Sequence, residues 1–118
     1  MTKNHESSIL ILSQSNAFIT QITSLLESKN YNLHIFQTFE TLKVTLQQNS
    51  YALLLLDFDS FRADVQHILL HITQHPQHAQ MPIFSFMASA SKDAYTSLLQ
   101  LGVNEFFTEP FIEPLLLH

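Results

Sequence analysis

The apolar positions of this 118-residue chain alternate between two periods along its length. Short aliphatic runs typical of strands are separated by longer stretches in which apolar residues recur at helical spacing. The most apolar run, Tyr51 to Leu56, ends sharply at Asp57, as is typical of a central strand buried on both faces of a parallel sheet. The predicted strands are 8–13, 33–36, 51–56, 83–87 and 103–108, and the predicted helices are 16–30, 38–48, 62–74, 91–101 and 111–118.

Local signals support several of these boundaries. Ser15 or Asn16 can cap the first helix, because both side chains accept hydrogen bonds from N–H groups of a first turn. Pro76 ends the third helix. Gly102, the only glycine, directly follows Leu101, at the position where a left-handed backbone favours glycine.

The predicted order is a strand–helix unit repeated along the whole chain. Regular alternation with short connections predicts an α/β fold, in which helices cover both faces of a parallel sheet. Ligands of such open sheets bind beyond the carboxyl ends of the strands. Candidate chemistry is therefore expected at 13–14, 57–59, 87–88 and 108–110.

Composition and charge narrow the functional classes. Hydrophobic residues make up 46% of the chain and charged residues only 13%, which excludes a disordered tail and fits one domain spanning 1–118. With a net charge of -5 and no basic run, we expect no nucleic-acid binding by this domain. The absence of cysteine excludes thiolate chemistry and fits a cytoplasmic setting, and no apolar run approaches the length of a membrane span.

Over its whole length the chain resembles the receiver domain of two-component response regulators, chemotaxis regulators included. The resemblance rests on the five strand–helix units, on Asp57 ending the third strand, on Ala88 at the end of the fourth, and on the segment LGVNEFFTEPF at 101–111. It implies a flavodoxin-like three-layer (βα)5 sandwich with a five-stranded parallel sheet of order 2-1-3-4-5. It also makes Asp57 the equivalent of the phosphoacceptor aspartate.

Other positions depart from the receiver pattern, so the resemblance implies a degenerate receiver, or pseudo-receiver. The acidic pair that helps receivers hold Mg²⁺ corresponds to Ser13 and Gln14, neutral groups that are poor ligands for a hard dication. Met87 stands at the position of the fourth-strand hydroxyl, and Glu109 stands at the position of the lysine. We therefore expect that Mg²⁺ binding is lost, that no other cofactor or metal is used, and that Asp57 is not phosphorylated.

The resemblance implies a signalling module rather than an enzyme, acting through protein partners or controlling an attached output domain. The sequence ends partway through the predicted fifth helix, so we expect a parent protein that continues beyond it. Phe106 corresponds to the switch aromatic of receivers. Tyr95 and Leu99 are predicted to join it in an apolar patch that mediates homodimerisation, with packing against the fifth helix as the alternative.

Alternatives remain open at the carboxyl ends of the strands. One alternative is that Asp57 is a polar residue without function at the end of a strand. Another is that Asp57 is a conventional phosphoacceptor with unusual partners. With Asp59 and Glu109, it would instead form a rearranged metal site of oxygen ligands. The loop 13–16 would either cap the first helix or bind an anion, as in a flavodoxin-like small-molecule-binding domain.

A histidine series marks the third predicted helix. His67, His71 and His75 recur every four residues, a spacing that lets two imidazoles share a zinc ion. They lie on the flank and back of the apolar stripe, and no third ligand is evident. We therefore expect a solvated histidine face, with a zinc site as the alternative.

Overall fold

The computed structural model describes residues 8–26, 29, 31–76, 78, 80–88 and 92–108. Its strands are β1 (Ser8–Leu12), β2 (Asn32–Phe36), β3 (Leu53–Asp57), β4 (Ile83–Met87) and β5 (Glu105–Thr108). Its helices are α1 (Asn16–Leu26), α2 (Phe39–Gln48), α3 (Val65–Gln74) and α4 (Lys92–Gln100), with a short 3₁₀ helix, η3 (Phe58–Ser60), after β3. The predicted fifth helix, 111–118, lies outside the described residues.

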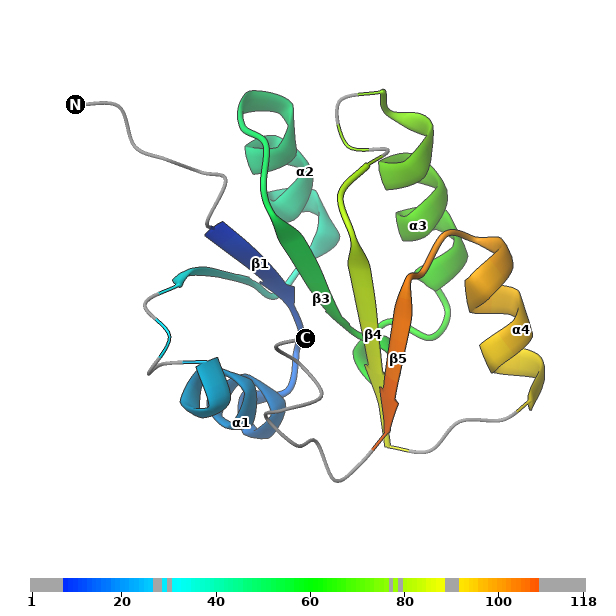
Figure 1. Ribbon diagram of the computed structural model, residues 1–118, viewed down its shortest axis with the longest axis horizontal. Coiled ribbons are helices and arrows are strands. Elements are labelled where there is room, and N and C mark those ends of the chain that lie inside the picture. Colours follow the sequence, from blue (N-terminus) through cyan, green and yellow to red (C-terminus); the bar gives the residue numbers. More distant parts are fainter. Residues whose placement is uncertain are drawn as a thin grey trace.

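The strands form one five-stranded parallel sheet in the order β2-β1-β3-β4-β5. This confirms the predicted order and the flavodoxin-like fold class. The chain passes from β1 outward to β2 and then crosses back to β3, so the order reverses between β1 and β3. Figure 1 shows α1 on one side of the sheet and α2, α3 and α4 on the other. None of the described helices has both the length and the apolar character needed to cross a bilayer.

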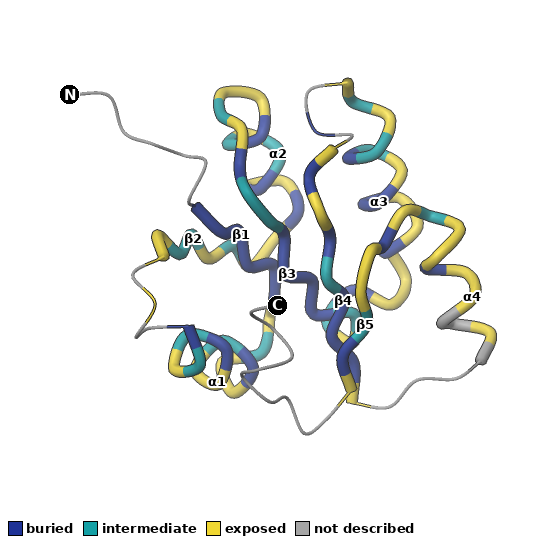
Figure 2. Tube along the Cα trace, viewed as in Figure 1, coloured by how far each residue is buried: buried dark blue, intermediate teal, exposed yellow. Residues whose placement is uncertain are grey.

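Each face of the sheet carries its own apolar core, because successive side chains of a strand point to opposite faces. Leu10 and Leu12 of β1 pack with buried residues of α2 and α3 such as Leu42 and Ile68. Ile9 and Ile11 of the same strand belong to the second core, together with Phe18 and Ile22 of α1. The continuous dark blue of β1 and of most of β3 in Figure 2 reflects this burial on both sides.

Two predicted boundaries on either side of Asp57 are wrong. The third strand begins at Leu53 rather than Tyr51 and includes Asp57, because the apolar run reports burial and not strand pairing. The third helix begins at Val65 rather than Arg62. Between them the chain turns, as the N–H groups of Phe61 and Asp64 donate to the carbonyls of Phe58 and Phe61 at 3.0 and 2.8 Å.

Gly102 has the predicted left-handed backbone, with φ of 103°. Its N–H donates to the Leu99 carbonyl at 3.2 Å, which ends α4. A Cβ at this position would lie 2.9 Å from Cγ2 of Thr73, so both the backbone and the neighbouring α3 exclude a side chain.

Candidate functional site

Strand register brings the predicted site residues to one edge of the sheet. Leu12 is aligned with Leu56, and Asp57 is aligned with Phe86. Ser13, which directly follows β1, therefore emerges beside Asp57 at the carboxyl ends of the central strands. This is the edge at which open α/β sheets bind ligands.

The Asp57 carboxylate is buried and is held by two serine hydroxyls. Asp57 is only 5% exposed, and Ser13 is fully buried. Oδ2 of Asp57 accepts hydrogen bonds from Oγ of Ser13 and from Oγ of Ser60, each at 2.7 Å. Hydroxyl donors at this distance stabilise the charged form of a carboxylate.

Backbone groups tie the same hydroxyls to the loop after β1. Gln14 donates its N–H to Oγ of Ser60 at 3.0 Å, and Ser15 donates its N–H to Oγ of Ser13 at 3.0 Å. The Gln14 side chain itself is exposed. The β1–α1 loop and η3 are therefore closed on each other through Asp57.

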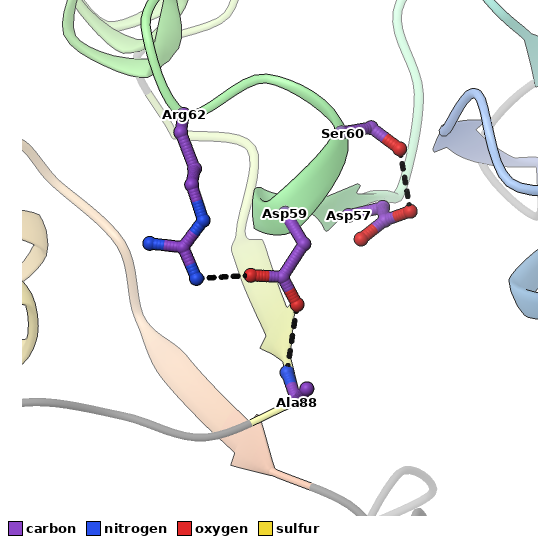
Figure 3. A network of polar contacts seen from close by, with 5 residues as sticks. All are labelled: Asp57, Asp59, Ser60, Arg62 and Ala88. Carbon is purple, nitrogen blue, oxygen red and sulfur yellow. Dashed lines mark hydrogen bonds and ion pairs between the residues drawn. The ribbon is translucent and has the colours of Figure 1, made fainter.

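Asp59 points to different partners. Figure 3 shows its carboxylate between Arg62 and the backbone of Ala88, while Asp57 turns toward Ser60. Oδ2 of Asp59 accepts the N–H of Ala88 at 2.8 Å, and Oδ1 accepts from Nη2 of Arg62 at 2.6 Å. Arg62 also lies over the ring of Phe58, with 5.1 Å from its guanidinium carbon to the ring centroid. Asp59 thus fastens η3 to the end of β4.

A cleft of about 290 Å³ opens beside the two carboxylates. It runs between the first turns of α1 and the ends of β3 and β4. Its lining combines the two carboxylates with hydroxyl, amide, aromatic and aliphatic groups: Ser15, Ala17, Phe18, Gln21, Asp57, Asp59, Ser60, Phe86, Met87 and Ala88.

The remaining predicted positions contribute differently. Met87 is 1% exposed and belongs to the apolar core. Its side chain is a thioether and has no hydroxyl to donate to the cleft. Phe106 is partly buried against that same core, and Leu99 is 48% exposed on α4. The side chain of Tyr95 and the whole of Glu109 lie outside what the structure describes.

The described donors do not fit a hard dication of the Mg²⁺ type. Such an ion needs several oxygen ligands, usually including carboxylates. Ser13 directs its hydroxyl to Asp57, and Asp59 is engaged by Arg62 and Ala88. Among the described residues, no group of three or more His, Cys, Asp or Glu side chains is arranged to hold a metal ion.

The loop at the start of α1 caps the helix. Oγ of Ser15 accepts the N–H of Phe18 at 3.2 Å, which satisfies one of the free donors of the first turn. This agrees with the capping interpretation of the loop 13–16.

The histidines of α3 are less solvated than the sequence predicts. His67 is exposed, but His71 and His75 are half-buried, and the ring of His71 lies edge-on to Phe39 of α2 at 5.3 Å. Burial lowers the pKa of His71 below 6.5, with further lowering by Lys43 and the neighbouring histidines. This burial follows from helix packing, because Phe39 of α2 covers the flank of the apolar stripe of α3 on which His71 lies.

Residue spacing did not predict two contacts, those of Ser60 with Asp57 and of His78 with Leu46. Ser60 donates to Asp57 from three residues away, a spacing that a hydroxyl in a tight turn can satisfy. His78 is 3% exposed, and its Nε2 lies 2.6 Å from the Leu46 carbonyl. No periodic signal marks His78, because it lies in the connection after α3.

The solved structures that match this fold include receiver domains and response regulators. The receiver domain of a sensor histidine kinase from Pseudomonas aeruginosa, solved with a magnesium ion in its active-site cleft, matches with a TM-score of 0.81 and 21% identity over 94% of this chain and 91% of that chain. The chemotaxis protein CheY4 of Vibrio cholerae matches with a TM-score of 0.83 and 13% identity over 95% and 93%. The Mn²⁺-bound response regulator Rcp1 matches with a TM-score of 0.77 and 23% identity over 92% and 86%.

No family model matches the sequence, and no curated protein does so either. The resemblance inferred from the sequence therefore agrees with the structural comparison at the level of fold. This chain has the fold of response-regulator receiver domains.

Proposed function

We propose that this chain is a receiver-type signalling domain that acts through contacts with other proteins, without Mg²⁺-dependent phosphorylation of Asp57. The similarity of its fold to receiver domains supports the signalling class. The local chemistry at Asp57 supports the second half of the proposal.

The observation that carries the proposal is the pair of hydroxyls on Asp57. Ser13 and Ser60 both donate to Oδ2 at 2.7 Å, and Ser13 comes from the position where receivers have an acidic metal ligand. Neutral hydroxyls satisfy the carboxylate without bringing a positive charge. The protein therefore supplies two hydroxyl donors to Oδ2 of Asp57 without a metal ion.

Asp59 supports the same conclusion from the β4 side. Its carboxylate already accepts the N–H of Ala88, a backbone donor at the strand end that an incoming anion would otherwise use. A phosphoryl group on Asp57 would add negative charge near this second carboxylate. At an effective dielectric constant near 20, two unit charges about 4 Å apart repel by about 4 kcal/mol.

A Mg²⁺ titration followed by backbone amide NMR tests the metal half of this proposal. We expect no saturable shift of the Ser13, Gln14 and Asp57 amides in the unchanged chain. The double variant Ser13→Asp/Gln14→Asp restores the acidic pair and should show such shifts. Saturable Mg²⁺ shifts at these amides in the unchanged chain would contradict the proposal.

A further inference from the structure

The carboxylate of Asp57 has one engaged oxygen and one that the described residues leave without a donor. Both serine hydroxyls donate to Oδ2, and no described N–H or O–H donates to Oδ1. Figure 3 shows this second oxygen pointing away from Ser60, toward the side on which Asp59 lies. Asp57 is 5% exposed and lines the cleft. Its Oδ1 is therefore a hydrogen-bond acceptor with little access to solvent outside the cleft.

No described lysine or arginine forms an ion pair with Asp57. The guanidinium of Arg62 is paired with Asp59 instead, at 2.6 Å. A buried carboxylate without a counter-ion is costly, and a cation that reaches it is correspondingly stabilised. The polar end of the cleft therefore favours a positively charged group over a neutral or negative one.

The other walls of the cleft are aromatic and aliphatic. Phe18 and Phe86 lie edge to face with 5.4 Å between ring centroids, and both line the cleft with Met87. Aromatic rings attract organic cations and also pack against alkyl carbons. Gln21 and Ser15 add polar groups near the mouth.

We propose that this cleft binds a small organic cation, with an ammonium group donating to Oδ1 of Asp57 and an alkyl body lying against Ala17 and the exposed edge of Phe18. A volume of about 290 Å³ has room for a short alkylammonium ion. The inference rests on the proposed function, since it requires Asp57 to be unmodified and free of metal. Such a ligand would supply the signal that phosphorylation supplies in conventional receiver domains.

The same features disfavour the other classes of ligand. A hard dication would find the oxygens of Asp59 engaged by Arg62 and Ala88, and the hydroxyl of Ser60 engaged by Asp57. An anion would meet the carboxylates of Asp57 and Asp59 with no described lysine or arginine lining the cleft.

The test is a backbone amide NMR titration of the full chain with n-butylammonium chloride. Parallel titrations use n-butanol, sodium butyrate and MgCl₂. We expect saturable shifts at the cleft residues with n-butylammonium, and much weaker binding of butanol and butyrate. Equal binding of butanol, or no saturable shift with n-butylammonium, would overturn the inference.

One variant and its matched control locate the binding site. Asp57→Asn keeps the shape but removes the charge, and should weaken n-butylammonium binding on the order of tenfold or more. Glu105→Gln removes an equal charge from the opposite end of β5 and should leave the affinity unchanged. Equal loss in both variants would show a nonspecific charge effect and overturn the site.

Ala17→Leu provides a second test that does not depend on the folding of the Asp57 variant. Ala17 is exposed in the first turn of α1 and lines the cleft, so a larger side chain should narrow the mouth and weaken binding. Unchanged affinity would place the ligand elsewhere. Saturable Mg²⁺ binding would contradict the proposed function, whereas absence of both Mg²⁺ and n-butylammonium binding would overturn only this inference.

Discussion

At the scale of single residues, two serine side chains are hydrogen-bonded to one oxygen of the Asp57 carboxylate. Ser13 and Ser60 donate to the carboxylate, and Ser13 is completely buried. Gln14 contributes through its backbone N–H rather than its side chain. Ser13 therefore contributes to this arrangement as a neutral hydroxyl donor.

Removing the Ser13 hydroxyl should destabilise the fold measurably. Ser13→Ala takes one donor from a buried carboxylate, which typically costs about 1–3 kcal/mol in the free energy of unfolding. Ser60→Ala should cost less, because Ser60 is only half-buried. Urea unfolding measures both, with Ser24→Ala on the exposed side of α1 as control. A Ser13→Ala loss no larger than that of Ser24→Ala would show that the bond contributes nothing to stability.

A second residue-scale prediction concerns Gly102. Gly102→Ala forces an alanine to adopt φ of 103° and places its Cβ against Thr73, so we expect a loss of about 1–3 kcal/mol. Thermal or urea unfolding gives the value. In a Thr73→Ser background, which lacks Cγ2, the steric part of the loss should disappear while the backbone part remains. An unchanged stability of Gly102→Ala alone would contradict the assigned backbone conformation.

At the scale of elements, the contact between the end of α2 and the connection after α3 contains the least expected feature of the fold. Nε2 of His78 lies 2.6 Å from the carbonyl of Leu46 at the end of α2, and its ring lies 4.8 Å from that of His75. Burial lowers the pKa of His78 below 6.5, against the raising effect of the Leu46 carbonyl and with further lowering by His75. The buried imidazole of His78 therefore joins the connection after α3 to the end of α2.

This arrangement predicts an acid-sensitive fold. Because the folded-state pKa values of His71 and His78 lie below 6.5, the unfolded chain binds more protons as the pH falls through that range. The free energy of unfolding should be retained above about pH 6.5 and should decrease as the pH falls toward the folded-state pKa values. Urea unfolding between about pH 5 and pH 8 measures this dependence.

His78→Gln separates this effect from general acid denaturation. Glutamine can still donate to the Leu46 carbonyl but does not titrate, so the decrease below about pH 6.5 should become shallower. His67→Gln changes an exposed histidine of α3 and should retain the pH dependence of the unchanged chain. Identical pH profiles for His78→Gln and the unchanged chain would exclude His78 as a source of the acid sensitivity.

At the scale of the whole molecule, sequence patterns were sufficient for the topology but not for the details of the site. The period of apolar residues predicted the alternating strands and helices and the parallel sheet, and the resemblance to receiver domains supplied the strand order. The 3₁₀ helix η3 escaped prediction, because three residues carry no periodic signal. The partner of Asp59, a backbone N–H of Ala88, also depends on how two loops meet in space.

The predicted dimer also belongs to this scale. Leu99 is 48% exposed on α4, which leaves an apolar side chain available for a partner copy. We expect self-association that is weakened by Leu99→Glu, as measured by sedimentation velocity over a range of protein concentrations. Val44→Glu, at a 57% exposed apolar position on α2, is the matched control and should leave association unchanged. A chain that stays monomeric at every concentration would contradict the dimer.

The most direct test of the central claim is the intact mass of the chain after incubation with Mg²⁺ and acetyl phosphate. The hydroxyl-bonded state of Asp57 predicts no gain of a phosphoryl group. A variant that carries Ser13→Asp, Gln14→Asp, Met87→Thr and Glu109→Lys restores the receiver pattern and serves as the positive control. A near-stoichiometric gain of one phosphoryl group in the unchanged chain, absent from Asp57→Asn, would contradict the account.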